Sequence, residues 1–98
     1  MTMAERNDLP IPEAAKNDPK SFELLRVWVA NKSQHVSLRV GIWDDPAAWG
    51  IMLADLARHV VNAYNQDAAR DPVETLQRIK AALDVELASP TDNPIGHT

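Results

Sequence analysis

The stretch that decides the fold runs from Val36 to Tyr64 and reads V-S-L-R-V-G-I-W-D-D-P-A-A-W-G-I-M-L-A-D-L-A-R-H-V-V-N-A-Y. Its first part alternates apolar side chains with others, which is the two-residue period of a β-strand. From Trp49 onward the apolar residues recur every three or four positions, which indicates an amphipathic helix. Between the two, Asp45 can accept backbone N–H bonds at a helix N-terminus, and Pro46 suits the first helical position. We therefore expect a strand that ends near Trp43 and a helix that begins at Asp45-Pro46.

The residues before this stretch predict a partner strand. Ser21 to Ala30, S-F-E-L-L-R-V-W-V-A, is rich in β-branched and aromatic residues, which favour strands. The polar segment 31–34 lacks the Asn-Gly or Asp-Gly pair of the tightest hairpins, so it predicts a four-residue loop. An even loop that pairs Ala30 with His35 places the aliphatic residues of both strands on one face, because a slip of one residue would reverse every side chain.

The same register gathers a different set of side chains on the second face. It predicts Arg26 opposite Arg39 and Trp28 opposite Ser37, and alternation places Trp43 on this face as well. Like charges directly opposite each other on a sheet are unfavourable by up to about 1 kcal/mol unless something neutralises them. Two large aromatic side chains on a face turned away from the helix would be exposed in a monomer, and exposed aromatic patches are typical of interfaces.

The helical segments are expected to differ in how widely they are buried. The first should end near Asn65, and its wide apolar arc predicts burial against two partners. Its stripe comprises Trp49, Met52, Leu53, Leu56, Val60, Ala63 and Tyr64. The second repeats the start signal at Asp71-Pro72 and should run to about Ala88 with a narrower stripe, as a peripheral helix does.

The expected architecture is α+β in the order β-β-α-α, with the hairpin packed on the first helix. We divide the chain into a flexible leader (1–20), a single domain (21–88) and a disordered tail (89–98). A two-stranded sheet is marginal alone and leaves both edges open. Either the leader supplies a third strand, or two copies pair into a four-stranded sheet.

Composition excludes several classes of protein. The chain has 98 residues, enough for one domain, and a formal net charge of −4 without a basic tract, which disfavours binding to duplex DNA. It has no cysteine, so it has no disulfide, no thiolate metal ligand and no cysteine nucleophile. It shows neither a signal peptide at its N-terminus nor an apolar run long enough to span a membrane, so we expect a cytoplasmic protein.

The segment from Gln34 to Tyr64 resembles the core of a family of short bacterial proteins of about 90–100 residues, a domain of unknown function. The likeness covers the chain from about Phe22 to Leu87. Its most distinctive part is W-D-D-P-A-A-W-G, from Trp43 to Gly50. The resemblance implies a small bacterial α+β domain, and it brings no activity and no catalytic residue with it.

The strongest candidate site is the second face of the hairpin, with Arg26, Trp28, Arg39 and Trp43, and His35 at the tip. Guanidinium groups recognise carboxylates and phosphates in a bidentate manner and stack on rings. A small anion, an acidic peptide or a partner subunit would satisfy this set. The alternative is that each arginine pairs with an acidic neighbour of its own, such as Glu23, Asp44 or Asp45.

Two other constellations have structural explanations. Asp55 and His59 lie one helical turn apart, which is the spacing of a surface ion pair as well as of an oriented base. Asp44 and Asp45 have the positions of helix-capping residues. We assign no catalytic residue, no metal ligand and no cofactor, because neither a nucleophile with its base nor a set of metal ligands can be assembled.

These observations favour a non-enzymatic protein–protein interaction or dimerisation module, most simply a homodimer, over an enzyme. The alternative is a sensor domain that binds a small anionic ligand through Arg26 and Arg39.

Overall fold

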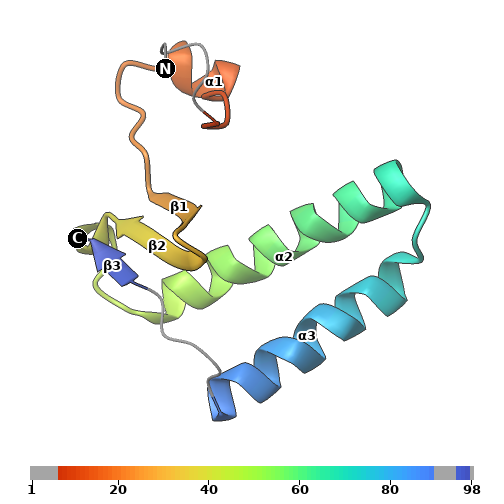
Figure 1. Cartoon of the computed structure of the whole chain (residues 1–98). Helices are drawn as coiled ribbons and strands as arrows, with labels where there is room; N and C mark the ends of the chain where they lie inside the picture. Colours follow the sequence, from red (N-terminus) through yellow and green to blue (C-terminus); the bar gives the residue numbers. More distant parts are fainter. Residues whose placement is uncertain (1–6, 90–94, 98) are drawn as a thin grey trace.

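The computed structural model describes residues 7–89 and the backbone of residues 95–97. A hairpin is followed by two long helices (Figure 1), which confirms the predicted α+β fold with the order β-β-α-α. The elements in chain order are α1 (Glu13–Lys16), β1 (Leu25–Ala30), β2 (Ser33–Leu38), a 3₁₀ turn η2 (Val40–Ile42), α2 (Ala47–Ala68), α3 (Pro72–Ala88) and β3 (Ile95–His97).

The hairpin turns through two residues, where four are predicted. Asn31 and Lys32 have φ angles of 52° and 64°, and Ala30 pairs with Ser33. Two successive residues with positive φ form the type of turn whose twist matches that of the flanking strands. The prediction of an even loop is confirmed. The pairing of Ala30 with His35 is wrong, because Asn-Lys makes the tight turn without a glycine.

The corrected register is displaced by two residues, so every strand side chain keeps its predicted face. Val27 pairs with Val36 and Leu25 with Leu38, and Val29 lies opposite Gln34. The aliphatic residues of both strands therefore still share one face. This aliphatic hairpin face consists of Leu25, Val27, Val29, Val36 and Leu38.

Both strands are shorter than predicted at the end away from the turn. After β2 the chain enters η2, where the alternating pattern predicts continued strand. The backbone N–H of Arg39 still donates to the carbonyl of Leu24 at 3.0 Å, one step beyond the ladder. Upstream, the N–H of Ser21 donates to the carbonyl of Asp18 at 3.0 Å, and this turn ends the extended run.

The third strand comes from the C-terminal end. β3 pairs in parallel with β2, so the strand order is β1-β2-β3. It lies within the segment 89–98 that the sequence predicts to be disordered. The described part of the leader, residues 7–20, contains α1 and no strand, so it does not supply the third strand of one alternative. Within the described residues, the outer edge of β1 has no partner strand.

Both long helices begin at the predicted aspartate-proline pairs. The Asp45 carboxylate accepts a hydrogen bond from the backbone N–H of Ala47 at 2.9 Å. The Asp71 carboxylate accepts one from the backbone N–H of Glu74, also at 2.9 Å. Each bond satisfies a donor that the first turn of a helix would otherwise leave open, so the capping role predicted for these aspartates is confirmed.

The C-terminal ends of the two long helices agree with the prediction to different degrees. α3 ends at Ala88, as predicted, whereas α2 continues to Ala68, past the predicted end near Asn65. α2 closes at Ala69, whose φ of 52° is left-handed and whose N–H donates to the carbonyl of Asn65. This conformation is the usual way to end a helix, although glycine adopts it at lower cost than alanine.

α2 and α3 double back on each other (Figure 1) and bury a narrow seam. Val61, 6% exposed, and Thr75, 7% exposed, are the buried residues of the described chain. Val61 lies on the same side of α2 as Ala57, which is half-buried. The predicted burial of the larger stripe is wrong, because Leu53 and Leu56 remain 51% and 43% exposed.

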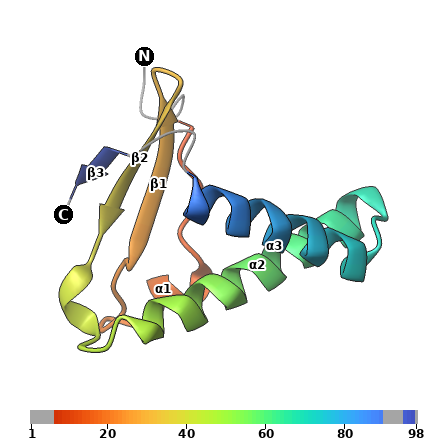
Figure 2. The same cartoon turned by 90° about the horizontal axis from the view of Figure 1, so that it is seen from below.

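The sheet and the pair of long helices form two arms (Figure 2). They diverge from the segment between β2 and α2, residues 39–46, which we call the joint. The predicted packing of the hairpin on α2 is wrong, since neither β1 nor β2 closely approaches either long helix. The chain exposes 8534 Å², whereas a compact monomer of this mass would expose about 5,600 Å². Its radius of gyration is 15.8 Å, against about 12.6 Å for a compact domain of this length. Within residues 7–89, one chain therefore lacks a core that covers its large apolar side chains.

Candidate functional site

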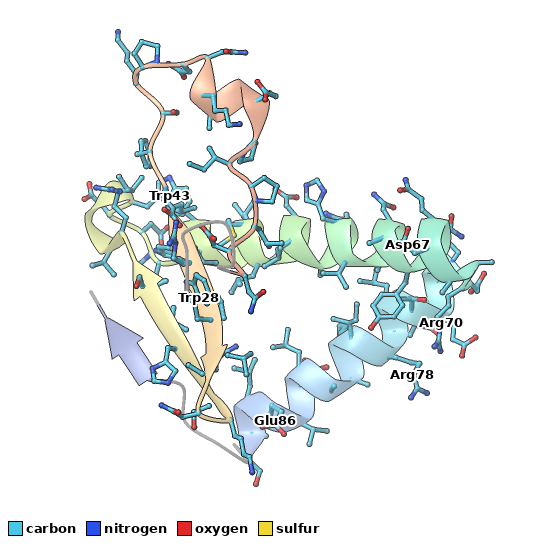
Figure 3. All side chains as sticks on the ribbon, turned by 45° about the horizontal axis from the view of Figure 1, so that its top comes forward. Trp28, Trp43, Asp67, Arg70, Arg78 and Glu86 are labelled. Atoms are coloured by element: carbon cyan, nitrogen blue, oxygen red, sulfur yellow. The ribbon has the colours of Figure 1, made fainter. Side chains whose placement is uncertain are left out.

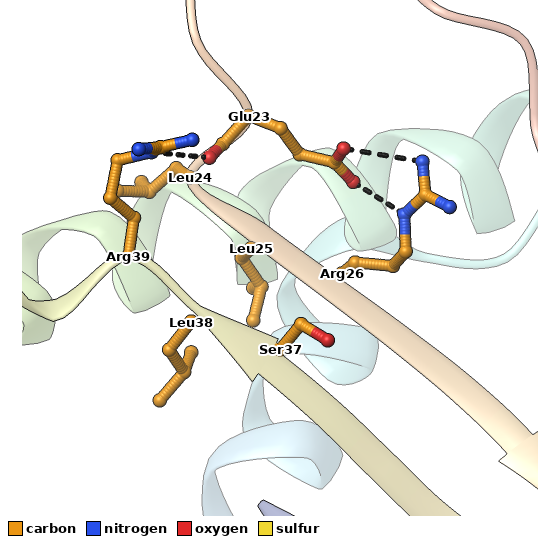
Figure 4. A pocket seen from close by; sticks show the side chains of 7 residues that line it. All are labelled: Glu23, Leu24, Leu25, Arg26, Ser37, Leu38 and Arg39. Carbon is orange, nitrogen blue, oxygen red and sulfur yellow. Dashed lines mark hydrogen bonds and ion pairs between the residues drawn. The ribbon is translucent and has the colours of Figure 1, made fainter. Parts of the chain in front are cut away.

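The predicted site corresponds to an open hollow beside the hairpin, at the end away from the turn (Figure 4). The hollow has a volume of about 420 Å³. Residues from both strands and from the segment just before β1 line it, namely Glu23, Leu24, Leu25, Arg26, Ser37, Leu38 and Arg39. It therefore contains both arginines that the sequence singles out.

Glu23 connects the two arginines (Figure 4). Its carboxylate accepts two hydrogen bonds from Arg26, at 2.6 Å from Nε and 3.2 Å from Nη2. Its backbone carbonyl accepts a hydrogen bond from Nε of Arg39 at 3.1 Å. The Arg39 guanidinium also lies over the ring of Phe22, 5.6 Å from its centroid, a cation–π contact. The bidentate Glu23 contact raises the pKa of Arg26 above its ordinary value.

The predicted opposition of the two arginines is wrong, because the register is displaced by two residues. Arg26 pairs with Ser37, and the backbone of Arg39 bonds to Leu24. The like-charge repulsion expected of that pair is therefore relieved by geometry. Pairing of Arg26 with an acidic neighbour, the alternative derived from the sequence, is the arrangement present.

The two sheet-face aromatics have separate surroundings (Figure 3). Trp28 is half-buried on β1 and pairs with His35, where Ser37 is predicted. His35 Nε2 lies 3.2 Å from the carbonyl oxygen of Ala30, across the hairpin turn.

Trp43 follows η2, so it is no longer part of the sheet. Its ring makes an edge-to-face contact with Trp49 of α2, at 5.2 Å between centroids and 81° between planes. Trp43 thus belongs to the joint between the arms.

A second hollow, which the sequence does not indicate, lies between the leader and β1. Its volume is about 640 Å³. The leader lines it from Asn7 to Pro12, and β1 contributes residues as far as Trp28. Phe22 and Glu23 border both this hollow and the arginine pair. In the sequence, Glu23 lies three residues before Arg26. In an extended chain this spacing does not by itself place the two side chains next to each other.

The remaining sequence candidates are in ordinary surface positions. Asp55 makes an ion pair with Arg58, with 3.7 Å between the charged atoms, and both side chains are largely exposed. Within residues 7–89, no three histidine, aspartate or glutamate side chains come together as metal ligands would. No helix in the described part of the chain is long and apolar enough to cross a membrane.

Comparison with known proteins finds similar solved structures and a family model. A solved structure from the photosynthetic bacterium Rhodopseudomonas palustrus CGA009, described as a "putative pyruvate dehydrogenase", is 27% identical and has a TM-score of 0.74. The match covers 98% of this chain and 98% of that one. No curated protein matches.

The family comparison agrees with the resemblance noted in the sequence, although whether W-D-D-P-A-A-W-G marks that family stays a prediction. The matching family model is a domain of unknown function, DUF5076, and it spans residues 8–91. The match includes the hairpin, the joint and both long helices. The chain belongs to the DUF5076 family.

Proposed function

We propose that this chain is a non-enzymatic interaction module that acts as a homodimer. The observation that carries the proposal is the exposed area of one chain, 8534 Å², which exceeds that of a compact monomer of the same mass by about 2,900 Å². Exposed large apolar side chains lie on the strands, on both long helices and in the leader.

The excess area is of the size that a permanent interface requires. Obligate homodimers bury about 2,000–5,000 Å² in total, or about 1,000–2,500 Å² on each partner. The excess on one chain, about 2,900 Å², exceeds the upper end of that range for one partner. Since surfaces of this kind are apolar in permanent assemblies and more polar in transient ones, the composition of the exposed surface favours a permanent dimer.

The surface that supports this proposal differs from the one predicted from the sequence. Arg26 is engaged by Glu23, Trp28 is half-buried, and Trp43 contacts Trp49 within the joint. Val27 and Val29 of the aliphatic hairpin face, and Leu53 and Leu56 of α2, are more exposed than either tryptophan. We therefore place self-association on those surfaces.

Sedimentation velocity over a dilution series tests the proposal. The expected result is a species of twice the chain mass of 10.9 kDa at tens of micromolar and below. The matched variant Arg26→Gln should retain that mass, because the guanidinium lies outside the proposed surfaces. A wild-type chain that sediments as a monomer at tens of micromolar would remove the proposal.

A second candidate function is binding of a small anion in the hollow between Arg26 and Arg39. The observation in its favour is that two guanidinium groups border one open hollow. The Glu23 carboxylate occupies the fork of Arg26, so an incoming carboxylate or phosphate has to displace it.

Thermal unfolding with added phosphate or malonate tests this second candidate. We expect both anions to raise the melting temperature of the wild type. The rise should be larger in Glu23→Gln, which removes the competing charge, and absent in Arg26→Gln with Arg39→Gln. Equal shifts in all three proteins would show that the anions act generally and would reject the site.

A further inference from the structure

Two residues of the aliphatic hairpin face, Val27 and Val29, are left open within the described part of the chain. Val29 is 79% exposed and Val27 48% exposed, although both point to the side that alternation marks as apolar. A sheet that is apolar on one face is stable when a helix or a second sheet packs against that face. The described elements of the same chain do not do so.

α2 presents the complementary surface. Leu53, Leu56, Val60 and Tyr64 are spaced by three or four residues, so they form one line along the helix, and each is more than a third exposed. This α2 stripe is centred about a quarter turn around the helix from Val61, so it adjoins the seam where α3 packs, and the Arg70 guanidinium lies over the ring of Tyr64. Within the described part of the chain, no sheet packs on this apolar helix surface.

The two surfaces match in length. β1 has six residues, which extend over about 20 Å at the rise of a strand. The α2 stripe from Leu53 to Tyr64 extends over about 17 Å at the rise of a helix. One α2 helix is therefore the right length to cover one hairpin.

The joint holds the two surfaces of one chain apart. The edge-to-face contact of Trp43 with Trp49 and the Asp45 cap fix the direction in which α2 leaves the sheet. The arms then diverge (Figure 2). For a chain to fold its α2 stripe onto its own hairpin, it would have to break these contacts at the joint.

We propose that the homodimer is arm-exchanged, with the α2 stripe of each chain packed on the aliphatic hairpin face of the other. This inference rests on the proposed self-association and specifies its interface. The arrangement has the two-fold symmetry of a homodimer. The hairpin of each chain contacts the α2 stripe of the other, so the same contact occurs twice. In this dimer, α2 of the partner covers the apolar face of each hairpin.

Two other dimer arrangements would leave more of the apolar surface exposed. Pairing of two β1 edges into a larger sheet satisfies backbone groups but leaves the α2 stripe and the aliphatic hairpin face exposed. Pairing of two α2 stripes covers the helices and leaves both hairpins exposed. Only the exchange of arms covers both surfaces at once.

Isotope-filtered NMR on the unmodified protein tests the arrangement directly. Chains labelled with ¹³C and unlabelled chains are refolded together, and only contacts between different chains are recorded. We expect cross-peaks from the methyl groups of Val27 and Val29 to those of Leu53 and Leu56. Cross-peaks only among Leu53, Leu56 and Val60 would support the helix-to-helix dimer instead and overturn the proposal.

Cysteine cross-linking gives an independent test, since the chain has no cysteine of its own. Val29→Cys and Leu53→Cys, carrying different tags, are co-expressed and oxidised. We expect the mixed disulfide to form several-fold more than either self-pair, and Val29→Cys with Asn62→Cys, on the opposite side of α2, to give none. A mixed yield no higher than this control would refute arm exchange.

The sedimentation result separates the two levels of failure. If the wild type is a monomer, self-association fails and arm exchange fails with it. If it is a dimer but the cross-linked and NMR contacts join like surfaces, the homodimer stands and the exchange of arms is wrong.

Discussion

Truncation of Leu56 to alanine should weaken self-association without disturbing the helix. Leu56 lies in the middle of the α2 stripe and is 43% exposed in the single chain. Alanine is the strongest helix former, so the substitution leaves the local backbone preference of α2 intact. The loss should therefore come from the surface that the partner covers.

The magnitude follows from that exposure. The change removes three carbon atoms, and burial of each is worth about 0.8 kcal/mol. The partner can cover only the part that the chain itself leaves open, 43%, which gives about 1 kcal/mol for each chain. A symmetric dimer loses this twice, and about 2 kcal/mol corresponds to a dissociation constant about 30-fold weaker.

The assay is sedimentation equilibrium of Leu56→Ala beside Asn62→Ala. Asn62 is exposed on the opposite side of the same helix, so its truncation is the matched control. We expect the control to keep the wild-type dissociation constant within about twofold, the usual range for exposed substitutions away from special features. Equal dissociation constants for the two variants would refute the assignment of the interface to the α2 stripe.

The remaining predictions concern local features of the chain, and chemical denaturation at fixed protein concentration measures each. Lys32→Gly should stabilise the protein by about 1 kcal/mol, because Lys32 has a φ of 64° that glycine adopts without steric cost; an unchanged or lower stability would argue against the two-residue turn. Ala69→Gly should stabilise it by up to about 1 kcal/mol for the same reason at the end of α2, where φ is 52°; a destabilised variant would mean that the helix ends elsewhere. Asp71→Ala should cost about 1 kcal/mol, because the carboxylate caps α3 through the N–H of Glu74; no loss would show that water satisfies that donor equally well.

The order of elements and the starts of the helices could be predicted because their causes are local. Asp45 and Asp71 each precede a proline, and capping needs only the next two or three residues. The alternation of the strands is equally local, so the face of each strand residue is correct. These signals do not depend on what the rest of the chain does.

The register and the candidate site could not be predicted, because both depend on one turn. Asn31 and Lys32 form a tight turn although neither is glycine, and the usual dipeptide signal is absent. The resulting displacement of two residues separates Arg26 from Arg39 across the ladder. The sequence offers Glu23 as one of several acidic partners for an arginine, but its contact with both arginines follows only from that geometry.

The predicted core was also wrong for a physical reason. An apolar stripe such as that of Leu53 and Leu56 shows that a helix face needs a cover, but it does not say which chain supplies it. The same holds for Val27 and Val29 on the hairpin. The sequence pattern predicts that the hairpin face packs on the helix stripe of the same chain, whereas neither strand of the hairpin closely approaches α2.

The central claim is that one chain lacks a sufficient core and completes it by self-association. The melting temperature as a function of protein concentration tests this most directly, because a native dimer that unfolds to monomers is stabilised by mass action. Over a hundredfold range of concentration the stabilisation is about 2.7 kcal/mol, which raises the melting temperature by about 5–10 °C for a folded unit of two chains. A melting temperature that stays constant over that range, with the mass of a single chain, would contradict the claim.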